Sequence, residues 1–308
     1  MDAIKGLHES ITTLGAGICA RSPEMMLATA MMLFMYCVFD EQEAQFHAHL
    51  EGAKRILSCS SSSQRQHPVV QFLNSWMLYC ETLSGFAQPF RNTQHPPEWL
   101  IPSKEPQSRP DLIVGLLGCS IEVFDSILSI NKMRAEVVAH NAQDTTGTTW
   151  QVRVALEEKL RGVRQTFSPD EASQSTSDQI TTSAATAELY RLASLLYLLR
   201  VVPVHGDEAQ RLFSLQQAFA ALEQVRVATS PWPVFMVACE ARTEERRVEI
   251  LDILDSMDAA RNVGNVRITR DIIQTVWKQQ DLRGSADVTG PVPWWLCIDS
   301  TIPVPWFT

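Results

Sequence analysis

The 308-residue sequence has little positive charge and no concentration of it. It holds 10 Lys and Arg against 15 Asp and Glu up to Trp150, and 16 against 20 after it, so the net charge of −9 divides as −5 and −4. No run of five or more basic residues occurs. Proteins that bind nucleic acid gain most of their affinity from Lys and Arg side chains that displace counterions from phosphates. The composition therefore argues against direct binding of DNA by this chain.

Cysteines are few, odd in number and widely spaced. The seven are Cys19, Cys37, Cys59, Cys80, Cys119, Cys239 and Cys297, and no two of them form a C-x-x-C pair. This spacing argues against both a disulfide framework and a cysteine-ligated zinc site. Most of them lie in apolar stretches, where a free cysteine behaves as a small buried hydrophobic residue. We therefore expect a reducing compartment, either nucleus or cytosol.

Long hydrophobic runs are missing as well. The longest, residues 25–39, spans 15 positions and includes Thr29, whereas a membrane-spanning helix needs about 20 apolar residues. The first 17 residues lack the charged start and apolar block of a signal peptide. We predict a buried helix at 25–39 and no membrane partner. Five methionines in this run suit an irregular core, although flexible thioethers also suit a surface that binds varied apolar partners.

Motifs of common enzymes are also absent. The sequence contains no G-x-S-x-G, no G-x-x-x-x-G-K-[ST] and no complete G-x-G-x-x-G, which excludes the usual signatures of a nucleophile elbow and of nucleotide binding. His47 and Glu51 would share one helix face and could ligate a metal ion, whereas His49 would point roughly 200° away from His47. We predict a chain that is not an enzyme and holds no metal or cofactor. The alternative is a helical metal-dependent enzyme that uses His47 and Glu51.

Helical periodicity dominates what is present. Apolar residues recur at intervals of three and four, and strand-like alternation is hard to find. Beyond residues 25–39, the predicted helices cover residues 42–57, 69–83, 112–130, 150–167, 178–202, 207–227, 243–263 and 266–279. The pattern predicts an all-α protein, a helical array of about ten amphipathic helices with little or no sheet.

Three polar or proline-rich segments separate these helices. We predict linkers at residues 58–66, 88–110 and 168–183. One helical domain is expected over residues 1–280, with a candidate sub-boundary in 168–183. The remaining residues, 281–308, hold Trp294, Trp295, Trp306 and four prolines. So many aromatic residues suggest a tail that docks onto the body of the protein or onto a partner.

Five short motifs occur in a definite order. They are the H-L-E-G-A segment with His49, Gly52 and Ala53; residues 72–79 with Trp76; L-G-C-S with Gly118; A-E-L-Y-R-L-A with Tyr190 and Arg191; and Trp232-Pro233 followed by Glu240, Arg247 and Trp277. Together they resemble the fungal-specific transcription factor domain, a regulatory region that in its family usually follows a zinc-cluster DNA-binding module. The resemblance covers roughly residues 7–280.

The resemblance implies structural roles for these residues and supplies no catalytic ones. Gly52 and Ala53 would let a neighbouring helix approach closely, and the aromatic motif residues offer large rigid packing surfaces. It also implies a nuclear, or cytoplasm-to-nucleus shuttling, transcriptional regulator, and control of a secondary-metabolite gene cluster is plausible for such a protein.

The sequence departs from the family in one respect. The zinc cluster needs six cysteines in C-x2-C-x6-C spacing, which does not occur here. We therefore expect action without direct nucleic-acid contact. The expected partners are a DNA-binding transcription factor, a second copy of the chain or a small-molecule effector. A passive dimerisation or scaffold module is the remaining alternative.

Overall fold

The computed structural model describes residues 22–39, 43–87, 109–139, 147–225, 228, 230–261, 264–284 and 292–297. Across these ranges 81% of residues lie in twelve α-helices. The other elements described are two strands of two residues each and one turn of 3₁₀-helix. The prediction of an all-α array is confirmed.

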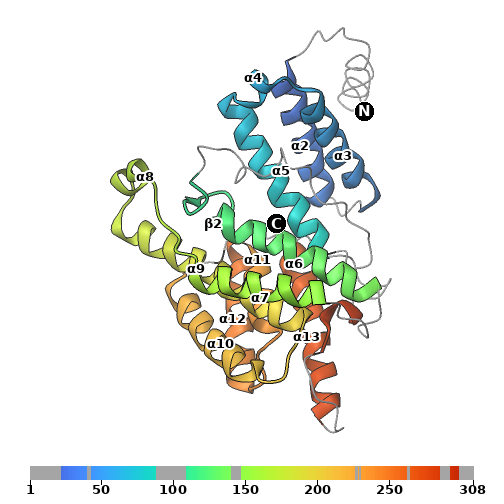
Figure 1. Ribbon diagram of the computed structural model, residues 1–308, viewed down its shortest axis with the longest axis vertical. Helices are drawn as coiled ribbons and strands as arrows, with labels where there is room; N and C mark the ends of the chain where they lie inside the picture. The colour runs from blue at the N-terminus through green and yellow to red at the C-terminus, as the bar shows by residue number, and fades with distance from the viewer. Residues whose placement is uncertain are drawn as a thin grey trace. The chain divides into compact units, whose positions relative to one another are not determined.

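The chain divides into two compact units, with the division between Glu81 and Thr82. The first unit contains α2 (Pro23–Phe39), α3 (Glu43–Cys59), α4 (Ser62–Arg65) and most of α5 (Pro68–Ala87), drawn in blue to teal in Figure 1. Helices α2 and α3 pack against each other, and Phe34 and Ala53 are completely buried. Lys54 of α3 joins α5 through an ion pair of 2.7 Å with Glu81.

The second unit holds the remaining elements. They are β1 (Ile113–Val114), β2 (Cys119–Ser120), α6 (Ile121–Ala139), α7 (Gly147–Gly162), α8 (Pro169–Gln174), α9 (Ser177–Val201), α10 (Asp207–Gln224), α11 (Pro231–Ala238), α12 (Glu244–Arg261), α13 (Gly264–Gly284) and η3 (Trp294–Leu296). Helix α9 packs against α6, α7, α10 and α11 (Figure 1). Its C-terminal half is buried on nearly every side, so α9 forms the centre of this unit.

Two predicted linkers are helical instead. Residues 168–183 contain α8 and the start of α9, and residues 58–66 contain the end of α3 and all of α4. The serines and threonines there act as helix caps: the Thr176 side chain accepts a hydrogen bond from the backbone of Gln179, and the Gln179 side chain accepts one from Thr176. Such capping boxes begin helices. The polar composition therefore marked helix ends, not loops. The third predicted linker lies mostly outside the described residues.

The helix predicted from residue 112 begins later. Strands β1 and β2 form an antiparallel pair in which Ile113 faces Ser120, and α6 starts only at Ile121. Gly115 and Gly118 lie in the connecting turn, and Gly118 has a positive φ of 72°. Glycine disfavours a helix interior and readily adopts this conformation. The apolar spacing of residues 112–119 was thus misread as helical.

The prediction of a buried helix over residues 25–39 is only half right. Met26 and Met31 of α2 are buried, but Met25 and Met32 are 64% and 63% exposed. Core filling therefore accounts for only some of the methionines. Within the described ranges, no helix has the length and apolarity needed to cross a bilayer.

Candidate functional site

Several of the motif residues meet at the centre of the second unit. Tyr190 of α9 stacks on Trp232 of α11, with ring centroids 5.7 Å apart and an angle of 20° between the rings. Gly118, in the turn before α6, lies against the edge of the Tyr190 ring. The pyrrolidine of Pro233 is buried in the first turn of α11, next to Trp232. Segments far apart in the sequence thus share one packing site.

An aromatic cluster surrounds this contact and includes the described part of the tail. The Phe86 ring packs against Tyr197, Trp232, Phe235 and Trp294. The ring centroid of Trp294, in η3, lies 4.4 Å from that of Phe86. Trp294 is completely buried and Trp295 is 6% exposed. Trp294 and Trp295 therefore belong to the core of the second unit.

A buried cation lies beside the cluster. The Arg134 guanidinium, on α6, donates hydrogen bonds of 2.9 Å to the backbone carbonyls of Gly85 and Phe86 and lies 5.2 Å from the ring centre of Trp294. These carbonyls are in the last turn of α5, where helix carbonyls lack intrahelical donors and carry partial negative charge. Burial lowers the pKa of Arg134. Arg134 thus caps α5 and stacks on the cluster.

A buried ion triad holds α9, α10 and α11 together. Glu240, two residues after the end of α11, pairs with Arg200 of α9 and with Arg211 of α10. Burial would raise the pKa of Glu240, but the charges of Arg200 and then Arg211 outweigh it and hold the pKa below its usual value. Arg200 also donates to the carbonyls of Val292 and Cys239. One arginine therefore ties the tail to two helices.

The remaining motif residues of the second unit attach α13 and α7 to neighbouring elements. Arg247 of α12 forms a two-pronged ion pair with Asp281, at 2.7 and 2.9 Å, and lies 5.4 Å from the Trp277 ring centre. The Trp277 indole donates to the carbonyl of Ala238 at 2.7 Å. Arg191 donates to the Leu160 carbonyl of α7. Each motif side chain thus joins its helix to another.

The first-unit motif residues have packing roles of their own. Ala53 is completely buried, while Gly52, His49 and Trp76 are half-buried. Trp76 packs against Phe72 one turn earlier on α5, with 6.4 Å between ring centroids. Partial burial lowers the pKa of His49, which favours its neutral form. These residues belong to a different unit from the aromatic cluster.

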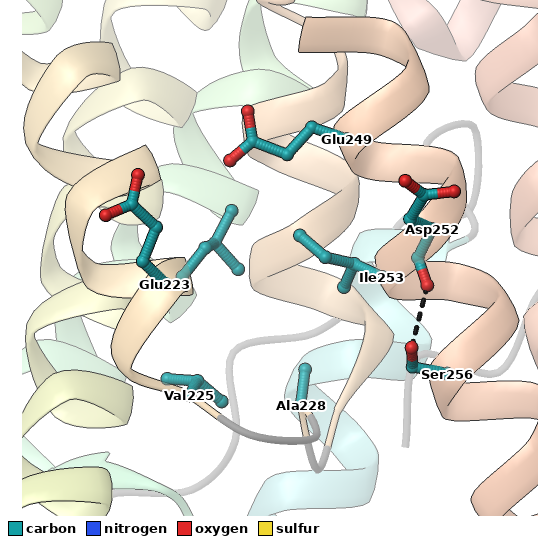
Figure 2. Close-up of a pocket in the computed structure, with 8 residues that line it drawn as sticks. Glu223, Val225, Ala228, Glu249, Asp252, Ile253 and Ser256 are labelled. Atoms are coloured by element: carbon teal, nitrogen blue, oxygen red, sulfur yellow. Dashed lines mark hydrogen bonds between the residues drawn. The ribbon is translucent and has the colours of Figure 1, made fainter.

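One pocket of about 240 Å³ opens between α10, α12 and the connection after α10. Figure 2 shows Glu223 on one side and Glu249 and Asp252 on the other, with Ile253, Val225 and Ala228 between and below them. Glu249 pairs with Arg246 at 2.7 Å. The residues that line the pocket include no basic side chain. Its chemistry suits a small molecule with an apolar part and a positive charge.

Comparison with known protein families identifies the family to which this chain belongs. Residues 1–304 match the family described as the fungal specific transcription factor domain. The chain belongs to this family. Its helical architecture is therefore that of a fungal transcription factor domain, a family of transcriptional regulators with a role in the nucleus.

A curated relative points the same way over a shorter stretch. The chain is 32% identical over 103 residues to a protein named "Transcription factor iacI" from Pestalotiopsis fici. The match covers 33% of this chain and 27% of that protein. No solved structure matches the chain significantly.

Of the two metal candidates, only Glu51 has a side chain among the described residues. Glu51 of α3 is paired with Lys54 at 2.9 Å, and the side chain of His47 lies outside the described residues. Among the residues that the structure describes, no group of three or more His, Cys, Asp or Glu could hold a metal ion. The fungal transcription factor domain family and its relative point to regulation rather than catalysis.

The buried cysteines offer no reactive thiolate. Cys80, Cys119 and Cys239 are completely buried, and burial raises the pKa of each thiol, to about 12 for Cys239. A thiol with so high a pKa stays protonated at neutral pH and is a poor nucleophile. Cys59 is exposed.

Sequence reasoning missed three arginines that organise the second unit. Arg134, Arg200 and Arg211 are all buried but were not singled out from the sequence. A signal existed for Arg200, which lies within the otherwise apolar run L-L-Y-L-L-R-V-V. Charged residues are rarely buried unless paired, so an arginine in such a run indicates a buried partner.

Proposed function

We propose that this chain is the regulatory part of a nuclear transcription factor and that it acts through protein partners or a bound effector, not through its own DNA contacts. The observation that carries the proposal is the family match over residues 1–304 on a chain with net charge −9 and no six-cysteine zinc-cluster spacing. In the second unit, the motif side chains of Arg247 and Trp277 join helices to one another. A secondary-metabolite gene cluster is the proposed target, and a DNA-binding transcription factor or a second copy the proposed partner.

Gene deletion followed by transcript profiling tests regulation. We expect the transcripts of a set of neighbouring biosynthetic genes to change together by several-fold in the deletion strain and to recover on complementation. Unchanged transcripts accompanied by loss of a single metabolic step would contradict regulation and favour an enzyme.

A gel-shift experiment tests the absence of direct DNA contacts. The purified chain should give no specific shift of promoter fragments at physiological salt, because it lacks the clustered positive charge that supplies affinity for phosphates. A specific nanomolar shift would contradict this part of the proposal. Partner capture from nuclear extract with the tagged chain should then recover a DNA-binding protein that is absent from a mock capture.

The pocket beside α12 favours a small-molecule effector as a second mode of regulation. Its carboxylates from two helices and its apolar floor of Leu222, Val225, Ala228 and Ile253 fit an organic cation. At about 240 Å³ it is smaller than typical drug-sized sites, so the ligand should be an amine of modest size.

Thermal-shift measurements with hexylammonium and spermidine as probes test this pocket. We expect saturable stabilisation of the wild-type chain that is lost in the double variant Glu223→Gln, Asp252→Asn. The control is Glu158→Gln, which removes an exposed carboxylate of α7 outside the pocket and should retain the response. Equal responses in all three proteins would show non-specific binding of cations and would rule out this effector site.

A further inference from the structure

Helix α2 carries one exposed face that has no charge. Met25, Met32 and Tyr36 are each 63–64% exposed, and no position from 25 to 39 holds a charged residue. The hydroxyl of Thr29, on the same face, donates to the carbonyl of Met25 at 2.7 Å, so this polar group is satisfied within the helix. We call Met25, Thr29, Met32 and Tyr36 the exposed α2 strip. Exposed apolar strips of this kind commonly mark a binding surface.

The sequence that precedes α2 contains a stripe of matching spacing. Residues 1–21 lie outside the described ranges, so the following expectation comes from their sequence alone. Its large apolar residues recur at alternating intervals of three and four, and every position between them is small or polar; they are Ile4, Leu7, Ile11, Leu14 and Ile18. This spacing places isoleucine at the a positions and leucine at the d positions of a heptad, which is typical of a helix that pairs with another helix.

The two stripes are in register about a break between them. Pro23 begins α2, and the residue before a proline disfavours the helical conformation, so a hairpin would turn near residues 21 and 22. The pairs of stripe residues that are equally distant from this turn are Ile18 with Met25, Leu14 with Thr29, Ile11 with Met32, and Leu7 with Tyr36. Connections of a few residues commonly join antiparallel helices. The stripe at 4–18 therefore fits the exposed α2 strip along its whole length.

Tethering and charge favour this segment over a separate partner. A segment joined through a few residues meets the strip at an effective concentration of about millimolar, which a separate protein must overcome by higher affinity. Residues 1–21 hold two acidic and two basic side chains, whereas a second copy would bring a net charge of −9 to a chain of the same charge. A membrane surface normally requires Lys or Arg beside the apolar face, and α2 has neither.

We propose that residues 4–18 are the occupant of the exposed α2 strip and that they act as a displaceable cover for it. The segment contains three glycines, which disfavour a helix interior, so its docking should be weak enough to reverse. Displacement would make an apolar helix face available to a protein partner. The cover would thus add a regulated surface to the proposed function, while the docking itself does not depend on that function.

Cross-linking of the full chain tests the register of the two stripes. With the exposed Cys59 replaced by serine, the double variant Ile11→Cys, Met32→Cys should form an intramolecular link with a short bismaleimide and keep the mass of a monomer. The matched control is Thr13→Cys with Met32→Cys, which moves the first thiol off the stripe and should link several-fold less. Peptide mass spectrometry identifies the positions that are joined.

Thiol labelling measures how far the strip is covered. In the same background, Met32→Cys should react with a maleimide at least about tenfold more slowly than Phe213→Cys, because docking leaves the thiol at position 32 accessible only in the open fraction of molecules. Phe213 is a suitable reference because its side chain is similarly exposed, at 58%. Adding Leu14→Glu should abolish the protection, whereas Thr13→Glu, which places the same charge beside the stripe, should preserve it.

Four results would overturn the proposal. Covalent dimers in place of linked monomers would identify a second copy as the occupant. Equal labelling at positions 32 and 213 would show that the strip is uncovered, and equal linking of the on-stripe and off-stripe pairs would exclude the register. Protection that survives Leu14→Glu would assign the cover to another part of the chain. Each result leaves gene regulation to be decided by the transcripts of the deletion strain, so the two proposals can fail separately.

Discussion

Gly118 and Tyr190 lie so close together that a Cβ atom on Gly118 would be 2.9 Å from Cε2 of the tyrosine ring. The φ of Gly118 is 72°, in the left-handed region that disfavours other residues. Two independent constraints therefore require glycine here: the turn between β1 and β2 and the approach of the ring. Since Tyr190 also stacks on Trp232, this contact joins three motif segments of the fungal transcription factor domain.

Gly118→Ala should lower the free energy of unfolding by about 2–4 kcal/mol, from backbone strain and the clash with Tyr190 together. The control is Gly206→Ala, at φ 100° with no atom within 4 Å of the added Cβ. It should show only the strain, about 1–2 kcal/mol. Urea unfolding monitored by circular dichroism gives both values. Equal losses in the two variants would show that the tyrosine contact costs nothing to disturb.

Glu240→Gln should be among the most destabilising single substitutions in the second unit. It would leave the buried cations Arg200 and Arg211 without their shared carboxylate, and breaking a buried pair in this way costs about 3–5 kcal/mol. Glu249→Gln removes a carboxylate from the partly exposed pair with Arg246 and should cost less than about 1 kcal/mol. Denaturant unfolding distinguishes them. A loss below 1 kcal/mol for Glu240→Gln would contradict the buried triad.

The same carboxylate predicts a pH dependence of stability. The pKa of folded Glu240 lies below its ordinary value of 4.5, so the unfolded chain takes up this proton at a higher pH than the folded chain. Its stabilising contribution is therefore complete above pH 4.5 and is lost as the pH falls through the lower folded value. Between about pH 5 and pH 3 the wild type should lose more unfolding free energy than Glu240→Gln. Parallel curves for wild type and Glu240→Gln would exclude this role for Glu240.

The helices could be predicted from sequence because their apolar stripes reflect burial against one neighbour. The expected helix over residues 178–202 is found as Ser177–Val201, and the one expected over 207–227 as Asp207–Gln224. The sequence-based predictions were wrong where polar residues make local hydrogen bonds that begin a helix. The serines and threonines of residues 168–183 cap helices, and composition alone does not separate a cap from a loop.

The contacts between motif residues could not be predicted from the sequence. Arg200 and Glu240 are 40 positions apart, and only the packing of α9 against α11 brings them together. Periodicity identifies the buried face of a helix but not its neighbour. The exposure on α2 was missed for the opposite reason: an apolar run predicts burial, but Met25 and Met32 are 64% and 63% exposed.

Trp294 should be as important to stability as a central core residue, although it lies only 14 positions from Thr308. Its ring is completely buried and stacks on Phe86 at 4.4 Å, so Trp294→Ala should lower the free energy of unfolding by about 3–5 kcal/mol through the cavity it leaves. Leu296, two residues later and 63% exposed, provides the control, and its substitution by alanine should cost less than about 0.5 kcal/mol. Urea unfolding followed by circular dichroism measures both, and hydrogen exchange should show faster opening around Arg134 and Phe86 in Trp294→Ala alone. If the two variants were equally stable, residues 292–297 would be an accessory tail; a large difference would make them part of the folded regulatory domain.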